Sequence, residues 1–306
     1  MLSRTADNLY WMTRMVERAE NQISLLEAAY RMEQLPGAGA DWDAVLDAVG
    51  QKEIFLKKYD AMTTPDVLKF MIFDRDNPSS LYSCWQAGRE NGRSERNCLP
   101  EEMYESLNGT WVQMQGMYFD LLVRQGFVDF FEWMKNRAEL FRGLTVSLMV
   151  KDEAFQFARL GTFVERADNT ARILDIKHHV LTDKNDRDDG DLIDYYQWGE
   201  LLRSLGAWQA YRTVYKKGLT PDDITEFLIF SPVFPRSMRN SYSEIVTSLT
   251  ELKPESASLT MASREDAFLR AGTLAGILKE GSLHDFLTGF IDFTAKVSDS
   301  IRAEFM

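Results

Sequence analysis

The chain has 306 residues, of which 45% are hydrophobic and 12% aromatic, so it can bury a large core as one domain or as two closely packed halves. Its 47 acidic and 35 basic residues give a formal net charge of −12 at pH 7. This charge repels phosphate backbones and anionic lipid headgroups, which disfavours nucleic-acid and membrane-surface functions.

Hydropathy and the rarer residues narrow the class of protein further. No stretch reaches the roughly 18 apolar residues of a membrane span, and the opening segment 1–21 carries charges throughout, with no signal-peptide core. We therefore expect a cytoplasmic protein. Two cysteines and three histidines are too few to indicate a disulfide framework or a histidine-rich metal centre.

The first predicted helix begins near the start of the chain. Its apolar residues recur in steps of three and four, which places them on one helix face: Leu9, Met12, Val16, Ala19, Ile23 and Leu26. Pro36 and Gly37 are expected to end it. Similar spacing continues through five later ranges, 101–124, 126–149, 153–182, 192–217 and 262–304. Alternating strand patterns are hard to find, so we predict an all-α protein.

Two segments, 42–73 and 198–230, repeat one another in order. The identities recur at a nearly constant offset: Trp42 with Trp198, Gly50 with Gly206, Tyr59 with Tyr215, Thr64-Pro65-Asp66 with Thr220-Pro221-Asp222, and Pro78-Ser79-Ser80 with Pro235-Arg236-Ser237. The threonine of each Thr-Pro-Asp tripeptide is the expected N-cap of a short helix. We predict a tandem duplication, approximately 1–150 and 151–306, folded as a single domain. It would be a helical bundle whose halves are related by a pseudo-twofold axis.

The hexapeptide VERAEN of the first half returns as VERADN in the second half. On a helix, Glu20 and Asp168 lie at the edge of the apolar face, and Glu17 and Glu165 lie further round. A carboxylate at the margin of a core needs a cation or several hydrogen-bond donors, because an unpaired buried charge is costly. Arg172 is one turn after Asp168 and is a candidate partner. If the two helices pair, the acidic residues of both halves approach one another.

Two interpretations of these carboxylates remain open. They could form Glu–Arg networks that fix the register of the helices, or they could line a central polar pocket that binds a ligand or a metal. Di-iron bundles use a Glu-x-x-His motif, and the histidine is absent here, so a ferritin-like oxidase is a poor fit. Oxygen ligands alone could still hold Mg²⁺ through water and a phosphate.

A basic run, AGRENGRSERN, occupies residues 87–97. On a helix Arg89, Arg93 and Arg96 share one side, where they could meet the glutamates, bind an anionic ligand or form a solvated face. The acidic segment 182–194 lacks EF-hand spacing and is predicted to be a solvated linker. The chain has no Walker A, GxGxxG, GxSxG or HExxH motif, so no catalytic nucleophile is identified.

Three segments, MLSRTADNLYWMTRMVERAEN, RENGRSERN and FARLGTFVERADNTARILD, together resemble the bacterial alpha-E family, an all-helical family of poorly defined function. The resemblance covers essentially the whole chain. Members of that family are typically encoded beside, or fused to, circularly permuted ATP-grasp proteins and transglutaminase-like proteins, which implies a role in ATP-dependent amide or peptide-bond formation. Besides the candidate ligand residues named below, the family's characteristic residues fall by position on Arg4, Trp11, Arg18 and Arg166.

From the resemblance we expect an auxiliary protein that acts with an ATP-grasp amidoligase and offers an Arg/Glu-lined pocket to a peptide, an amino acid or the partner. The candidate ligand-binding residues are Arg14, Glu17, Glu20, Arg89, Glu90, Asn91, Arg93, Arg96, Glu165, Asp168, Asn169 and Arg172. One alternative is an enzyme that uses the paired carboxylates as acid/base groups or as Mg²⁺ ligands. The other alternative is a structural scaffold.

Overall fold

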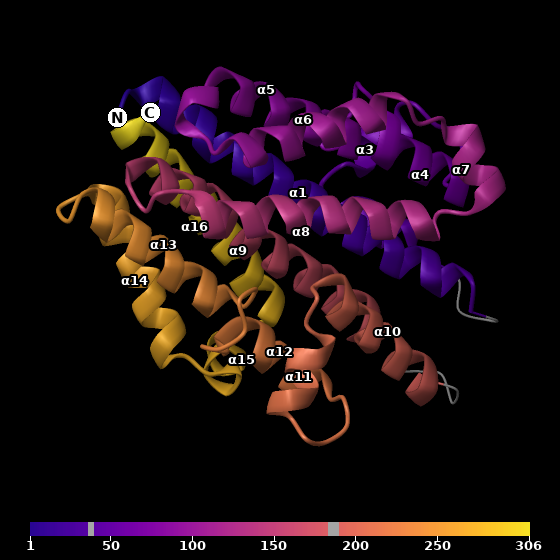
Figure 1. The fold of residues 1–306 in the computed structure, drawn as a ribbon. Coiled ribbons are helices and arrows are strands. Elements are labelled where there is room, and N and C mark those ends of the chain that lie inside the picture. The colour runs from indigo at the N-terminus through magenta and orange to yellow at the C-terminus, as the bar shows by residue number, and fades with distance from the viewer. Residues whose placement is uncertain (36–39, 183–189) are drawn as a thin grey trace.

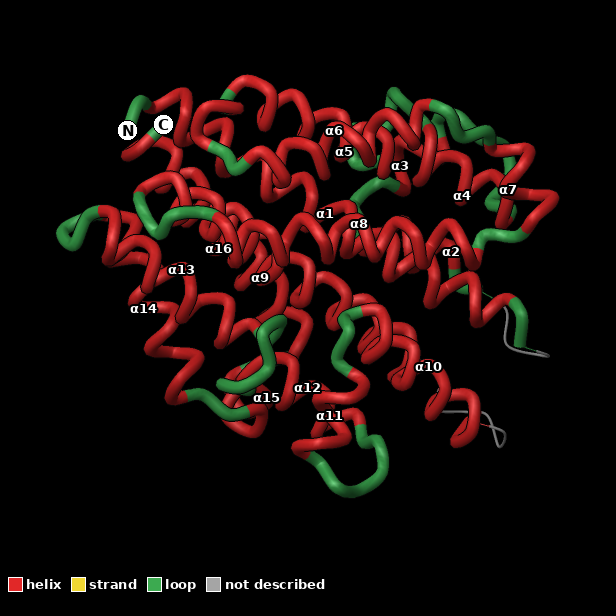
Figure 2. The backbone as a smooth tube through the Cα atoms, in the orientation of Figure 1, coloured by secondary structure: helices red, strands yellow, loops and turns green. Residues whose placement is uncertain are grey.

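The computed structural model describes residues 1–35, 40–182 and 190–306. In these ranges the chain forms sixteen α-helices and one short 3-10 helix, with no strand (Figure 2), so the all-α prediction is confirmed. The first series comprises α1 (Ser3–Glu33), α2 (Trp42–Ala48), α3 (Lys52–Leu56), α4 (Thr64–Phe73), α5 (Leu81–Ser94), η1 (Arg96–Cys98), α6 (Glu101–Gln115), α7 (Phe119–Gln125) and α8 (Val128–Leu148). The second comprises α9 (Glu153–Thr182), α10 (Gly190–Ser204), α11 (Trp208–Val214), α12 (Pro221–Phe230), α13 (Met238–Leu252), α14 (Ala257–Ala271), α15 (Leu274–Glu280) and α16 (Leu283–Phe305).

The two longest helices, α1 and α9, pack against each other through the middle of the molecule. Helix α1 also packs on α5 and α8, and α9 packs on α13 and α16. Two other helices connect the two groups, since α10 packs on α1 and α2 packs on α9. Figure 1 shows the two chain termini close together at one end of the α1/α9 pair. The contact between α1 and α9 is therefore the centre around which these helices pack.

Helices α4 and α12 begin with the same local structure. The Thr63 and Thr220 side chains accept hydrogen bonds from the backbone N–H groups of Asp66 and Asp223, and each threonine hydroxyl donates to that aspartate at 2.6 Å. The prediction of Thr220 as an N-cap is confirmed, whereas Thr64 was the wrong choice in the first copy. Thr63 is the N-cap because Asp66, which bonds to it through both its backbone N–H and its carboxylate, lies three residues later.

The helices that follow these caps also pack alike. The same three-ring arrangement occurs twice: Phe55, Tyr59 and Phe70, and Tyr211, Tyr215 and Phe227. In each, the first two rings are stacked, with centroids 4.7 Å and 4.9 Å apart, and the third meets both edge-on. Ser80 and Ser237 then cap α5 and α13 with their side chains. The sequence repeat is thus accompanied by repeated local geometry.

Three of the predicted long helices are divided into shorter ones: 101–124, 192–217 and 262–304. Helix α6 ends before Gly116, and α10 ends two residues before Gly206, whose φ of 64° lies in the left-handed region that favours glycine. Thr273 and Ser282 cap new helices in the last of these ranges, which starts α15 and α16. Apolar periodicity carried across these breaks because both flanking helices bury a face against the same core.

Two predictions touch the parts of the chain outside the described residues. The break expected at Pro36 and Gly37 falls in 36–39, after α1 has ended at Glu33. Of the linker predicted over 182–194, residue 182 belongs to α9 and residues 190–194 belong to α10, so the prediction is wrong there, and 183–189 lie outside the described residues. In the described part of the chain, no helix combines the length and apolar character needed to cross a membrane.

At Gly161 the backbone of α9 lies very close to α1. A Cβ atom added there would overlap the backbone carbonyl oxygen of Tyr10 and the hydroxyl of Thr13. We therefore expect Gly161→Ala to lower the free energy of unfolding by about 1–3 kcal/mol, as overpacking does elsewhere. The matched control is Gly143→Ala on α8, where an added Cβ meets nothing within 4 Å and a helix-interior alanine should stabilise by roughly 0.5–1 kcal/mol. Urea denaturation of both variants measures this, and equal stability changes would contradict the close-approach argument.

Candidate functional site

The contact between α1 and α9 brings the two Val-Glu-Arg-Ala segments face to face. Arg166 of α9 donates from Nε and Nη2 to the Glu17 carboxylate, at 2.9 Å each. Arg18 of α1 donates from Nε and Nη2 to Glu165, at 2.5 and 3.0 Å. Each helix thus supplies the cation for the other helix's carboxylate, and Glu17 and Glu165 are only 3% and 4% exposed. The pairing is reciprocal and fixes the register between α1 and α9.

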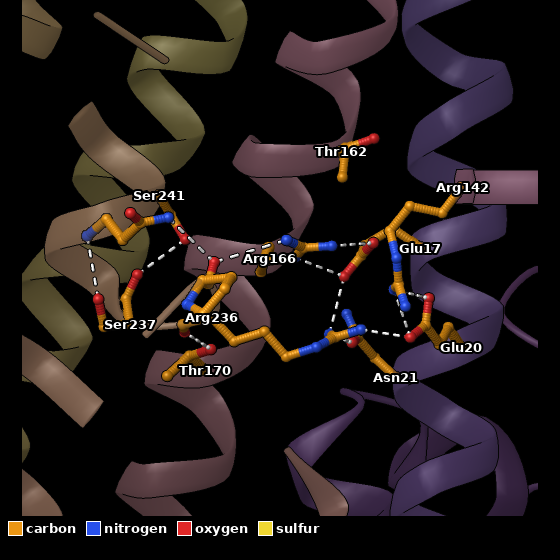
Figure 3. A network of polar contacts seen from close by, with 12 residues as sticks. Glu17, Glu20, Asn21, Arg142, Thr162, Arg166, Thr170, Arg236, Ser237 and Ser241 are labelled. Atoms are coloured by element: carbon orange, nitrogen blue, oxygen red, sulfur yellow. Dashed lines mark hydrogen bonds and ion pairs between the residues drawn. The ribbon is translucent and has the colours of Figure 1, made fainter. Parts of the chain in front are cut away.

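Two further arginines converge on the α1 carboxylates (Figure 3). Arg236, just before α13, donates to Glu17 at 2.8 Å, to Glu20 at 2.5 Å and to the Asn21 side-chain oxygen at 2.6 Å. Arg142 of α8 donates to both oxygens of Glu20 at 2.6 Å. One buried cluster therefore joins α1, α8, α9 and the turn before α13.

The carboxylates of α9 have different partners. Arg14 of α1 donates to Glu165 at 2.9 Å, and its Nη1 also donates to the hydroxyls of Tyr10 and Ser298 at 3.2 and 3.0 Å. Asp168 accepts from Arg172, one turn later on the same helix, at 2.8 and 3.1 Å, as predicted. The two buried glutamates are thus each held by two arginines, but the second arginine comes from a different element in each case.

The arginines outweigh the effect of burial on both glutamates. Burial alone would raise the pKa of Glu17, but Arg166 and Arg236 lower it to about 2. Burial likewise opposes Arg18 and Arg14 at Glu165, whose pKa is also lowered to about 2. Both groups are therefore ionised at neutral pH. A general acid needs a proton to give at working pH, so neither glutamate suits that role.

A cavity of about 680 Å³ opens beside Glu17, and we name it the Glu17 cavity. Its polar wall carries Glu17, Glu20, Arg142, Arg159 and Arg166, and its apolar wall carries Phe141, Phe155 and Phe163. Gln156 also lines it, is only 7% exposed, and has a side-chain oxygen with no hydrogen-bond partner. Such an orphaned buried acceptor carries a free-energy cost that a ligand N–H group would remove.

The basic run of α5 does not take part in this cluster. Arg89 donates to Asn108 and pairs with Glu90, Arg93 also pairs with Glu90, and Arg96 lies over the Tyr104 ring. The hypothesis that these arginines neutralise the glutamates of the two hexapeptides is wrong. Asn91 shares α5 with Arg89 and Arg93, whereas Arg96 lies in η1. The reason is geometric: α5 packs along α1, but its arginines face their own helix and α6 rather than the α1/α9 contact.

Sequence reasoning missed Arg142, Arg236, Arg159 and Gln156, which complete the site. Only Arg236 had a visible signal, because it replaces Ser79 between matching proline and serine residues of the repeat. The other three lie in ordinary helical patterns. Six of the predicted residues are brought together around the α1/α9 contact: Arg14, Glu17, Glu20, Glu165, Asp168 and Arg172. Asn169 lines a smaller cavity on the other side of the α1/α9 pair.

The carboxylates are poorly placed for a divalent metal ion. Across residues 1–35, 40–182 and 190–306, no group of three or more His, Cys, Asp or Glu side chains is gathered so that it could hold one. Glu17, Glu20, Glu165 and Asp168 each already accept from at least one guanidinium. A Mg²⁺ ion would have to displace those cations, and oxygen-only coordination needs several such oxygens together.

Removing one charge of the central cluster should be strongly destabilising. Glu17→Gln leaves Arg166 and Arg236 without their shared carboxylate, and breaking a buried pair in this way costs about 3–5 kcal/mol. The control is Asp43→Asn, which removes an exposed partner of Lys52 and should change stability little. Urea denaturation of both variants tests this, and a Glu17→Gln protein as stable as the control would exclude a central role for the cluster.

The lowered pKa values also predict acid sensitivity. A carboxylate whose folded-state pKa lies below its unfolded value stabilises the fold above the unfolded pKa and stops doing so as pH falls. For Glu17 and Glu165 the window runs from the ordinary value of 4.5 down to about 2. We expect the free energy of unfolding to fall across this window, and less steeply in Glu17→Gln. Denaturant titrations at a series of pH values measure both slopes, and identical slopes would contradict the prediction.

The sequence was compared with family models, curated proteins and solved structures. The model of the Alpha-E family, described as a predicted alpha-helical domain with a conserved ER motif, matches residues 1–306. No curated protein and no solved structure matches. Glu-Arg occurs in this chain at 17–18, 95–96 and 165–166, and the first and last of these form the reciprocal ion pairs between α1 and α9. With an all-helical fold and a match over the whole chain, the protein belongs to the Alpha-E family.

Proposed function

We propose that this protein is an auxiliary peptide-binding protein that acts with an ATP-grasp amidoligase, and that the Glu17 cavity receives the peptide or amino acid. The observation that carries the proposal is the cavity itself, in which paired charges, phenylalanine rings and an orphaned amide oxygen meet. Its volume of about 680 Å³ falls within the range of roughly 300–1,000 Å³ that small-molecule sites occupy.

The chemistry of the walls matches that of a short peptide. Arg159 is half-buried over the Phe155 and Phe163 rings and pairs with Glu244 through Nη2, and its remaining guanidinium donors can take a ligand carboxylate. Glu251, which also lines the cavity, supplies an acceptor for an ammonium group, and the orphaned oxygen of Gln156 suits a peptide N–H. Phenylalanine walls favour an apolar side chain. Separate sites for both charged ends and for the backbone favour a peptide over a simple anion.

The partnership with a ligase rests on the family. The resemblance implies ATP-grasp and transglutaminase-like neighbours, and the chain has none of the phosphate-binding motifs that would let it bind ATP itself. A binding protein that presents or holds the peptide fits both facts. We place this activity in the cytoplasm, where ATP-dependent ligation occurs, and we propose neither nucleic acid nor membrane as a partner, in keeping with the net charge of −12.

We further infer that the single domain arose by tandem duplication, with halves approximately 1–150 and 151–306 related by a pseudo-twofold axis. The repeated caps, the repeated three-ring clusters and the reciprocal Glu–Arg pairs support this inference. So does the element order, because each helix from α1 to α8 has a counterpart at the same place from α9 to α16. Under this relation Arg14 of α1 corresponds to Thr162 of α9, and Ser79 corresponds to Arg236.

The two alternatives fit the geometry less well. An enzyme that uses the paired carboxylates would need one of them protonated or bound to a metal, whereas arginines hold Glu17 and Glu165 ionised and occupied. A pure scaffold has no use for a large cavity with an orphaned acceptor. If the protein were only a scaffold, filling the cavity would leave the partner's activity unchanged. The proposed binding function predicts that this activity falls.

Filling the cavity from within tests the proposed function. Thr162→Arg places on α9 the residue that α1 carries as Arg14, so its guanidinium should reach Glu17 and occupy the cavity. We expect the ligase neighbour to co-purify with the wild-type chain. In that partner's ligation assay, the Thr162→Arg variant should stimulate ligation at least about tenfold less than the wild-type chain does. A tenfold loss corresponds to ~1.4 kcal/mol.

The control is Thr250→Arg, which adds the same charge at an exposed position of α13 outside the cavity. It should behave like wild type. The proposed partnership is overturned if no association is detected and the partner's ligation is the same with and without this chain. Equal stimulation by both variants would overturn the role of the Glu17 cavity.

A further inference from the structure

A second cavity, of about 240 Å³, lies across the α1/α9 pair from the Glu17 cavity. We name it the Ser79 cavity. It is bounded by Arg18 and Gln22 of α1, by Asp168 and Arg172 of α9, and by Ser79 in the turn before α5. Its volume is below the roughly 300 Å³ of sites for drug-sized ligands. Any ligand that it binds is therefore small.

The other half of the chain explains why this space exists. Pro78-Ser79-Ser80 and Pro235-Arg236-Ser237 occupy the same place in the repeat, and Ser80 and Ser237 both cap the following helix. In the second copy, the Arg236 side chain extends from this turn to the acidic residues of α1 (Figure 3). In the first copy a serine stands there, and the corresponding volume beside α9 is the Ser79 cavity. The arginine side chain that fills this space in the second copy is replaced by a serine in the first copy.

The cavity presents two guanidinium groups with unused donors. Arg18 engages Glu165 through Nε and Nη2, and Arg172 engages Asp168 through the same two nitrogens. In both arginines the Nη1 donors take no part in these pairs, although a guanidinium offers five N–H donors in all. Two guanidiniums lining one small cavity suit a carboxylate, which accepts such donors in a planar, bidentate way.

An acceptor in the same cavity also lacks a partner. Gln22 is 4% exposed, lines the cavity, and its side-chain oxygen has no hydrogen-bond partner. A buried acceptor left unsatisfied costs about 1–3 kcal/mol. A ligand that donates an N–H at this point would remove that cost. The cavity therefore requires an acceptor group against the arginines and a donor group against Gln22.

From this complementarity we infer that the Ser79 cavity binds a free α-amino acid, with the carboxylate on Arg18 and Arg172 and the ammonium on Gln22. The charged side chains that line it, Arg18, Arg172, Glu165 and Asp168, sum to zero. A zwitterion preserves this balance, whereas a dianion such as phosphate or a lone cation would leave a net charge in the cavity. The inference goes beyond the proposed function, because it concerns a different cavity and requires no ligase partner.

The experiment is isothermal titration calorimetry on the full chain with L-alanine, L-glutamate and L-lysine. Acetate, methylammonium and inorganic phosphate are titrated as single-charge and dianion comparisons. We expect at least one amino acid to bind, and each comparison compound to bind at least about tenfold more weakly or not at all. Tight phosphate binding, or no binding by any of the three amino acids, would overturn the inference.

Substitutions at Ser79 locate the binding. Ser79→Arg copies Arg236 into the first half and should plug the cavity, and Ser79→Met should fill it without adding charge. Both should weaken amino-acid binding by at least about tenfold, whereas Ser79→Ala, which leaves the cavity open, should bind like wild type. Thr162→Arg, which fills only the Glu17 cavity, should also leave this binding intact. Unchanged affinity in Ser79→Arg and Ser79→Met would overturn the assignment.

Folding of each variant is checked by circular dichroism. Should neither filled variant fold, a crystal structure of the wild-type chain with the tightest-binding amino acid decides the matter. Density beside Arg18 and Arg172 supports the site, and density elsewhere overturns it. Loss of ligase association with amino-acid binding intact would mean that the proposed function fails while the Ser79 cavity stands.

Discussion

The structure depends on the exchange of Glu–Arg pairs between α1 and α9. Glu17 and Glu165 are buried at the centre of the molecule, where an isolated carboxylate would be prohibitively costly, and each is neutralised by the arginine that follows its counterpart in sequence. The exchange works in only one register, because a shift along either helix would separate both pairs at once. Helices α5, α8, α13 and α16 then pack around the α1/α9 pair.

We infer that this buried cluster contributes more to the specificity of the fold than to its net stability. Burying several charges is expensive, and well-packed apolar residues are often at least as stabilising. Here the arginines come from α1, α8, α9 and the turn before α13, so the cluster is complete only when all four segments are in place. A partly assembled fold would leave uncompensated charges in its core. The cluster therefore selects one arrangement of helices that are otherwise similar in pattern.

In the proposed duplication, the Glu17 and Ser79 cavities lie where the two halves differ. Arg14 reaches Glu165 where the second half has Thr162, and Thr162 lines the Glu17 cavity. Arg236 reaches Glu17 where the first half has Ser79, and Ser79 lines the second cavity. Each half thus keeps one long side chain where the other half is open. Two cavities with polar walls result, one on each side of the same buried cluster, and their walls are held rigid by ion pairs.

The sequence by itself determined the helical class, the position of α1, α8 and α9, and the repeat, because apolar periodicity and capping are local properties of the chain. The helical pattern placed Glu17 and Glu165 further from the apolar face than Glu20 and Asp168, whereas the structure buries Glu17 and Glu165 most deeply and leaves Asp168 partly exposed. The sequence also determined the Asp168–Arg172 pair, whose members are one helical turn apart. Only the tertiary structure decided which arginines neutralise the glutamates. Arg142 and Arg236 lie more than a hundred residues from Glu20, whereas Arg89 and Arg93, which the pattern offered as possible partners, bind residues of α6 and α5. Docking of helices sets such long-range pairs and the cavities beside them, and no local periodicity encodes how far each side chain must reach.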